Sequence, residues 1–173
     1  MSTVITIVVV DLVIAAAAYG LSFNRLVNAR QQTIDSWAAI DVELERRHTL
    51  IPDLVEAVSA SAEHERTLLQ QLVDADTRAS AAQHTPSGRS DPEAELARAA
   101  RAVIALRERY PALDSQQNFL RLQGELAITE DRIGAARRFH NTRVAELNRR
   151  VEAFPSNIVA GRHGIGRGEF FQN

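Results

Sequence analysis

The feature that most constrains this chain is an almost wholly apolar run from Thr3 to Leu21. About 19 residues of helix span roughly 28 Å, which is enough to cross the hydrocarbon core of a bilayer. A cleaved signal peptide normally begins with positive charge, which Met-Ser-Thr lacks, although the alanines at 15–18 resemble a cleavage site. A buried helix of a soluble domain is the other alternative. We therefore predict an uncleaved membrane anchor over residues 1–23.

A single carboxylate, Asp11, lies at the centre of this run. An aspartate at the middle of a bilayer costs about 2.5–3.5 kcal/mol on insertion scales. Asp11 is either protonated and tolerated, or it faces another helix, most simply that of a second copy. We hypothesise that the anchors self-associate through the face that carries Asp11.

The orientation follows from the charges next to the anchor. Arg25 and Arg30 come after it, and no acidic residue lies between the anchor and Asp35. The positive-inside rule then predicts a single-pass protein with its N-terminus outside and the remainder of the chain in the cytoplasm.

The residues after the anchor predict one long helix from about residue 24, because apolar and polar seam positions alternate at spacings of three and four. This seam comprises Ile34, Trp37, Asp41, Leu44, His48, Ile51, Val55 and Val58. Pro52 removes one backbone donor, but the seam keeps its phase across it. We therefore predict a bend at Pro52; the alternative is a new helix beginning at Thr49.

Three further helices are predicted. The second uses Leu68, Leu72, Ala75 and Ala79 and ends in a loop over residues 83–92, where Asp91 and Pro92 are typical of the start of a third helix. The fourth runs from about Ser115 to Ala153. Its seam comprises Phe119, Leu122, Leu126, Thr129, Ile133, Ala136, His140, Val144, Leu147 and Val151.

No segment after the anchor alternates as a strand would, so the predicted class is all-α. Short connections make successive helices antiparallel, which predicts an up-and-down four-helix bundle over residues 24–153. Its two long helices are roughly 57 Å long and its two short helices about half that. The short pair covers only the membrane-distal half, so the C-terminal tail or neighbouring protomers must cover the rest of the long pair.

Residues 154–173 form a glycine-rich segment for which we predict an extended C-terminal tail. Its aromatic and aliphatic residues favour docking against the bundle or against an adjacent copy over free disorder. Together with Asp11, the candidate oligomer contacts are Phe154, Ile158, Phe170 and Phe171.

Polar residues inside the seams form the candidate site. Asp41 and His48 lie in the first seam, and the helix-four segment at the level of Asp41 carries Glu130 and Arg137. A buried carboxylate needs a paired cation. We predict an Asp41–Arg137 pair within a network of Asp41, His48, Glu130 and Arg137; the alternative is a solvated Asp41 at the edge of the seam. Such a network fits helix register better than catalysis.

Other chemistry finds little support. The chain has no cysteine, its net charge is −2 and its pI is near 6.2, so nothing predicts a thiolate site or a nucleic-acid partner. The glycines at 161–168 match no phosphate-binding motif. Glu45 and His48 form one Glu-x-x-His, but a di-metal bundle needs two. We expect no catalytic residue, metal or cofactor.

Two segments carry a resemblance to a known family. The stretch FNRLVNARQQTIDSWAAIDVELERRHTLIPDLVEAVSASAEHE resembles the LemA signature, as does NFLRLQGELAITEDRIGAARRFHNTRVAELN followed by FPSNIVA. The matching positions include Asn24, Trp37, Ile40, Asp41, Arg46, Arg47, Pro52, His64, Gln123, Glu130, Arg137, Asn141, Asn148 and Phe171. His140 departs from the pattern, since tyrosine is common there.

The resemblance implies a bacterial inner-membrane protein with a helical bundle and an external N-terminus, and it implies no enzyme. Members are loosely linked to envelope or membrane-remodelling roles and to neighbouring membrane proteins. We expect a non-enzymatic, membrane-anchored scaffold that self-associates into a homo-oligomer. The alternative is an adaptor or regulatory subunit of a membrane enzyme, such as a membrane protease.

Overall fold

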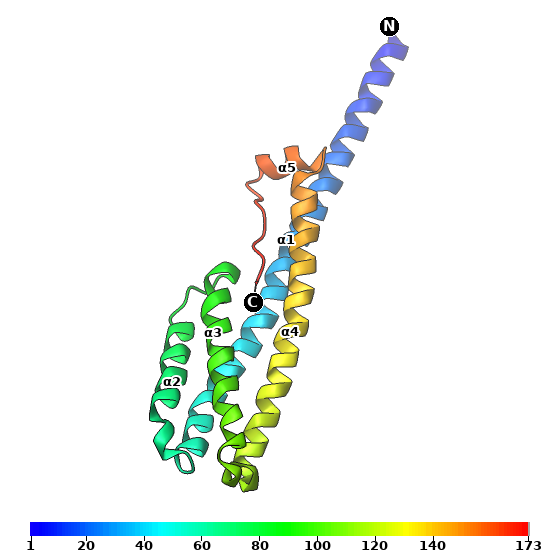
Figure 1. The fold of residues 1–173 in the computed structure, drawn as a ribbon. Helices are drawn as coiled ribbons and strands as arrows, with labels where there is room; N and C mark the ends of the chain where they lie inside the picture. The colour runs from blue at the N-terminus through cyan, green and yellow to red at the C-terminus, as the bar shows by residue number, and fades with distance from the viewer. Residues whose placement is uncertain (173) are drawn as a thin grey trace.

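The structure is a computed structural model of the whole chain, and it describes residues 1–172. It contains five α-helices and three short 3₁₀ segments in this range, without a β-strand (Figure 1). The α-helices are α1 (Ser2–Ser59), α2 (Arg66–Ser80), α3 (Pro86–Ile104), α4 (Gln117–Glu152) and α5 (Ser156–Arg162). The 3₁₀ segments are η1 (Glu63–Glu65), η2 (Ala105–Glu108) and η3 (Pro111–Ser115). The predicted all-α class is confirmed.

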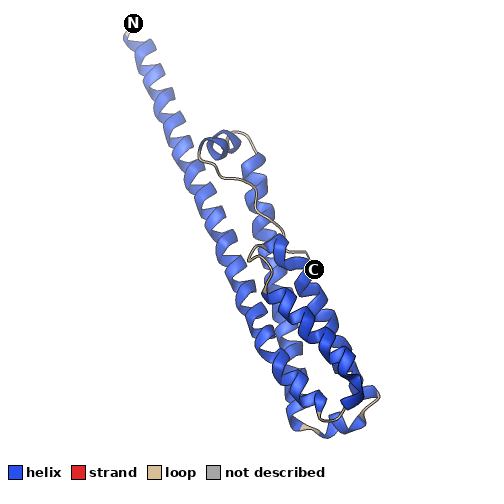
Figure 2. Cartoon of the chain, turned by 90° about the vertical axis from the view of Figure 1, so that its left-hand side faces the viewer, coloured by secondary structure: helices blue, strands red, loops and turns tan. Residues whose placement is uncertain are grey.

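The longest element, α1, is one uninterrupted helix of 58 residues (Figure 2). Pro52 lies inside it, so the alternative of a new helix at Thr49 is wrong. The buried positions continue in phase on both sides of the proline, at Ile51, Leu54 and Val58. Their packing offsets the one backbone hydrogen bond that proline removes.

The first part of α1 extends beyond the rest of the molecule (Figure 1). It is long and apolar enough to cross a membrane, and none of its 18-residue apolar window is buried within the chain. A core helix of a soluble domain would have a buried face, so this exposure argues against that alternative.

The seam predicted for α4 is largely confirmed, because eight of its ten positions are buried: Phe119, Leu122, Leu126, Thr129, Ile133, His140, Val144 and Leu147. The seam predicted for α1 is rotated by about one residue. Its buried face includes Thr33, Ser36, Ile40, Leu44 and Arg47, whereas Ile34 is half exposed. Several of the buried positions here carry polar side chains. The predicted seam therefore lies along one edge of the buried face and not at its centre.

The distal end holds the largest apolar core, to which α1, α2, α3 and α4 all contribute. There α2 and α3 pack against each other and against the last third of α1. The third helix begins at Pro86 and not near Asp91 as predicted. Thr85 caps it by accepting a hydrogen bond from the Gly88 amide at 3.1 Å, which allows the helix to begin inside the predicted loop.

The prediction of an extended tail is wrong for Ser156–Arg162, which form α5 and lie across α1 at the end of α4 (Figure 1). The residues after α5 run back along α1 and α4 without regular secondary structure. The sequence predicts that either the C-terminal tail or neighbouring protomers cover the part of α1 and α4 nearest the apolar segment. In the structure, the tail of the same chain covers it. One cluster joins α1, α4 and the tail through Leu26, Ala29, Leu147, Val159, Ala160 and Ile165.

Candidate functional site

A cluster of buried charges, which we call the charged core, lies where α1, α2, α3 and α4 meet. Arg47 of α1 and Arg89 and Glu93 of α3 are fully buried. A buried charge is tolerated only when it is paired and hydrogen-bonded. The arrangement of the partners therefore decides whether these helices can pack at all.

Glu93 is the centre of the charged core. One of its carboxylate oxygens, Oε2, accepts a very short hydrogen bond from Arg47. The other, Oε1, lies 3.1 Å from Arg89 Nη2 and 3.1 Å from His48 Nε2. Arg47 also donates to the Glu93 carbonyl at 3.1 Å and to Glu130 Oε1 of α4 at 2.6 Å. One guanidinium thus ties α1 to both α3 and α4.

His48 connects the charged core to α2. Its Nδ1 lies 2.6 Å from Asp76 Oδ1, and its side chain is only 10% exposed. Burial lowers the pKa of His48, but the hydrogen bonds and charges of Asp76 and Glu93 outweigh it and raise the pKa to about 9. For Glu93 the signs are opposite: burial raises its pKa. The hydrogen bonds and charges of His48 and Arg47 outweigh burial and hold the pKa of Glu93 below its usual range. His48 is therefore an imidazolium at neutral pH and Glu93 a carboxylate.

The charged core brings together three of the four residues predicted for the polar network. Asp41 and His48 join through Arg89, which is ion-paired with Asp41. Glu130 enters through Arg47. The cation that the structure places on Asp41 is Arg89 of α3, which sequence reasoning did not select, and the predicted Asp41–Arg137 pair stays a prediction.

Four members were missed from sequence: Arg47, Asp76, Arg89 and Glu93. Three of them lie on α2 and α3, whose register against α1 no pattern revealed. Arg47 was detectable, since it follows Ile40 and Leu44 at helical spacing on the face that is buried.

The charged core has the chemistry of a structural network. Its carboxylates are engaged by arginines or by His48, and it contains no nucleophilic side chain beyond Ser80, whose hydroxyl lies 3.3 Å from His48 Nδ1. Within residues 1–172, no group of three or more His, Asp or Glu side chains is arranged to hold a metal ion. The arrangement fixes the register of four helices, as a buried polar network can.

A second polar arrangement, the tail clamp, fastens the C-terminal residues to α4. The side-chain amide of Asn141 donates to the Phe171 carbonyl and accepts from the Phe171 amide, both at 3.0 Å. Asn148, two turns further along α4, pairs in the same way with the Gly168 carbonyl at 3.2 Å and amide at 2.7 Å. The two asparagines replace the hydrogen bonds that a neighbouring strand would supply.

His140 also belongs to the tail clamp. Its Nε2 lies 3.1 Å from the Glu169 carbonyl and its Nδ1 lies 3.0 Å from the Ser36 hydroxyl. Burial lowers the pKa of His140, so the ring is neutral at pH 7. A carbonyl only accepts, so the proton of the neutral ring is on Nε2. Trp37 packs against His140 and Phe171, with ring centroids 5.8 and 5.4 Å apart.

The residues predicted as oligomer contacts differ in their exposure. Phe171 is fully buried between Trp37 and the α1–α4 seam of its own chain, so its assignment as an intermolecular contact is wrong. Phe154 is 80% exposed, Ile158 59% and Phe170 40%. Asp11 is exposed on α1. These four remain candidates.

The fold and these two networks define an all-helical protein with one N-terminal helix apolar enough to cross a membrane and a tail clamped onto its longest helices. Residues 36–173 match the LemA family, and the chain belongs to that family. The match begins at Ser36, after the apolar segment of α1. A comparison with curated proteins found no match to the chain.

Proposed function

We propose that this protein is a non-enzymatic, membrane-anchored scaffold that self-associates into a homo-oligomer through its anchor. The globular part is then a helical bundle held at a fixed distance from the bilayer. The observation that carries the proposal is the exposed apolar segment of α1 with Asp11 at its centre.

The position of Asp11 on α1 supports a protein partner. Asp11 precedes Ala29 by 18 residues, which is five helical turns, so both lie on the same face. Further along the chain, α4 and α5 cover that face. At the level of Asp11 no described residue covers it. A second anchor packed there would shield a carboxyl group that otherwise costs about 2.5–3.5 kcal/mol in lipid.

An exposed apolar stripe on α1 supports lateral contacts outside the membrane. Val27, Ile34 and Val42 are all at least 41% exposed, and their spacings of seven and eight place them on one side of the helix. This side faces away from α4. If two anchors pack together in the membrane, this stripe would let the same two α1 helices stay in contact along the globular part.

Measuring the mass of the full chain in detergent tests the proposal. We expect a symmetric oligomer for the natural chain by native mass spectrometry, and a smaller species for Asp11→Leu. Asp11→Asn should retain the oligomer, because an amide still hydrogen-bonds between helices. The double variant Asp11→Val/Val13→Asp keeps one carboxylate near the same depth but turns it by about 200°, and should behave like Asp11→Leu.

A monomeric natural chain would refute the scaffold. Equal masses for the natural chain and for Asp11→Leu would refute the role of Asp11 and leave the stripe on α1 as the remaining contact to test.

The alternative function is an adaptor for a membrane enzyme, and one surface favours it. A mainly apolar groove of about 330 Å³ lies between α3 and α4, lined by Ala97, Ala100, Ile104, Leu126 and Ala127 among others. Grooves between helices accept the apolar face of a partner helix. A monomer that co-purifies with one membrane protein, and loses it on Ala127→Arg at an exposed position of the groove, would favour this function.

The proposed location is a bacterial inner membrane, with the N-terminus outside. Arg25 and Arg30 next to the anchor support this orientation. Cysteines introduced at Ser2 and at Ser115 can be labelled with a membrane-impermeant maleimide on intact spheroplasts. We expect labelling at position 2 only; labelling at position 115 only would reverse the orientation.

A further inference from the structure

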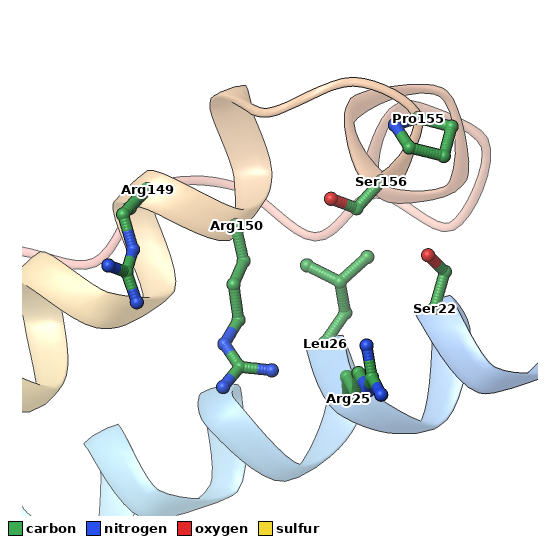
Figure 3. A pocket seen from close by; sticks show the side chains of 7 residues that line it. All are labelled: Ser22, Arg25, Leu26, Arg149, Arg150, Pro155 and Ser156. Carbon is green, nitrogen blue, oxygen red and sulfur yellow. The ribbon is translucent and has the colours of Figure 1, made fainter.

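A basic cavity lies where the apolar segment of α1 meets the globular part (Figure 3). Its volume is about 350 Å³, within the range of about 300–1,000 Å³ that is usual for small-molecule sites. Figure 3 shows Arg150 extending from α4 toward α1, with Arg25 and Ser22 on the facing helix and Ser156 above. The lining residues that matter here are Ser22, Arg25, Leu26, Arg149, Arg150 and Ser156.

The cavity carries uncompensated positive charge. Arg150 pairs with Glu146 at 2.6 Å, and its Nε is buried without a hydrogen-bond partner among the described residues. Arg25 and Arg149 are exposed, and within residues 1–172 neither lies within 4.0 Å of a carboxylate oxygen. Three arginines thus line one cavity, with Arg150 between Arg149 and Arg25 (Figure 3), and of the three the structure pairs only Arg150 with a carboxylate in the part of the chain that it describes. Like charges gathered in this way repel one another unless an anion joins them.

The cavity lies at the level where a lipid headgroup would be. Ser22 directly follows the apolar segment of α1. A second cavity separates α5 from the last turns of that segment, at Ala15, Ala18 and Tyr19, and beside it the Tyr19 hydroxyl lies 2.9 Å from His163 Nε2. Tyrosine and other amphipathic rings are enriched at the membrane–water interface.

The outer side of α5 supports the same depth. Ile158 of α5 is 59% exposed and lines a cavity with Ala15 and Ala18 of the apolar part of α1, and Phe154, two residues before α5 begins, is 80% exposed. A short apolar surface lying across an anchor fits the boundary between headgroups and acyl chains. These two residues would then contact lipid and place the three arginines among the phosphates.

We propose that this cavity binds the phosphate of an anionic phospholipid headgroup, held by Arg25, Arg149 and Arg150 with the hydroxyls of Ser22 and Ser156. The proposal rests on the proposed membrane anchoring of α1. Planar guanidinium groups match phosphate oxygens in pairs. The two serine hydroxyls supply donors for the polar groups of the headgroup. The choline of a zwitterionic lipid would be repelled by the same arginines, which gives the site its preference.

The test uses the full chain in neutral detergent, titrated calorimetrically with dihexanoyl-phosphatidylglycerol, dihexanoyl-phosphatidylcholine or glycerol 3-phosphate. Arg25→Gln/Arg149→Gln removes two exposed cations that make no ion pair among the described residues, so the fold should persist, as circular dichroism will check. Arg30→Gln/Arg162→Gln is the matched control: it makes the same charge change at the same end of the molecule, outside the cavity lining.

Each arginine near an anionic headgroup is worth about a fivefold change in affinity. We therefore expect the cavity variant to bind phosphatidylglycerol roughly 30-fold more weakly than the natural chain, and the control to stay within about twofold. Equal losses in both variants would indicate a diffuse electrostatic effect and overturn the site. Glycerol 3-phosphate binding as tightly as the lipid would place a soluble phosphate ester in the cavity and overturn the headgroup assignment.

Insertion is measured separately, by carbonate extraction of the chain reconstituted in phosphatidylcholine vesicles. A chain that inserts but binds both lipids equally overturns this site and leaves the anchoring intact. A chain that does not insert overturns the anchoring and the headgroup site together.

Discussion

Raising the pH from 6.5 to 9 should destabilise this protein, because His48 loses the proton that it shares with Asp76 and Glu93. His48 titrates near 6.5 in the unfolded chain and near 9 in the folded one. Its contribution to stability is therefore fully present below pH 6.5 and is lost as the pH rises through about 9. At about 1.4 kcal/mol for each pH unit, the loss in the free energy of unfolding is about 3 kcal/mol.

The interval from pH 6.5 to 9 isolates this group well. His48 is only 10% exposed and faces Asp76 from α2, Glu93 and Arg89 from α3 and the Ser80 hydroxyl, so solvent screens it little. The other histidine with a shifted pKa is His140, and burial lowers its pKa. A lowered pKa makes the contribution of His140 to stability rise with pH, opposite in sign to that of His48, and above pH 6.5 it amounts to no more than about 0.4 kcal/mol.

Urea unfolding of the full chain in detergent, followed by circular dichroism at 222 nm, gives the free energy at each pH. We expect the natural chain to lose about 3 kcal/mol between pH 6.5 and 9. His48→Gln keeps a hydrogen-bonding side chain but cannot be protonated, so its stability should start lower and stay flat. Parallel slopes in the two proteins, or a flat natural chain, would refute the assignment of His48 as the buried cation.

Three further perturbations test the charged core and the tail clamp. Arg47→Met should lower the free energy of unfolding by about 3–5 kcal/mol in the same urea assay, since it removes the main buried partner of Glu93. Its control, Arg78→Met, breaks an exposed pair with Glu95 and should cost less than about 1 kcal/mol. Asn141→Ala/Asn148→Ala should speed hydrogen exchange at the amides of Gly168 and Phe171, while Asn118→Ala, which removes an exposed contact with Arg121, should leave them protected. Phe171→Ala should cost about 3–5 kcal/mol and shift the Trp37 emission to the red, and Phe170→Ala, at a 40% exposed site, should do neither. Unchanged Trp37 emission in Phe171→Ala would contradict the packing of the tail against α1.

The helices themselves were largely predictable. The seam of α4 alternates apolar side chains at three and four residues, and a single helix satisfies such a pattern without help from the rest of the chain. The continuity of α1 through Pro52 was predictable for the same reason, because the seam stays in phase on both sides. The phase of α1 itself was harder, since Thr33, Ser36 and Arg47 are buried beside its apolar positions.

The charged core was only half predictable. A polar residue in a seam signals that a partner exists, and this was enough to select Asp41 and His48, while counting residues from the distal turn to the level of Asp41 selected Glu130. Which cation meets Asp41 depends on the rotation of α3 and on its offset along α1. Because α3 begins at Pro86 and not near Asp91, its residues lie at other heights along α1 than predicted, and Arg89 meets Asp41. No periodicity carries that information.

The sequence by itself determined the all-α class, the apolar segment with Asp11 and most of the buried face of α4, because these depend on neighbours within one helix. Only the tertiary structure decided that Arg89 meets Asp41, that Asn141 and Asn148 hold the tail, and that α5 closes a basic cavity against α1. Contacts between distant segments follow from the relative rotation and offset of whole helices, which many side chains set together.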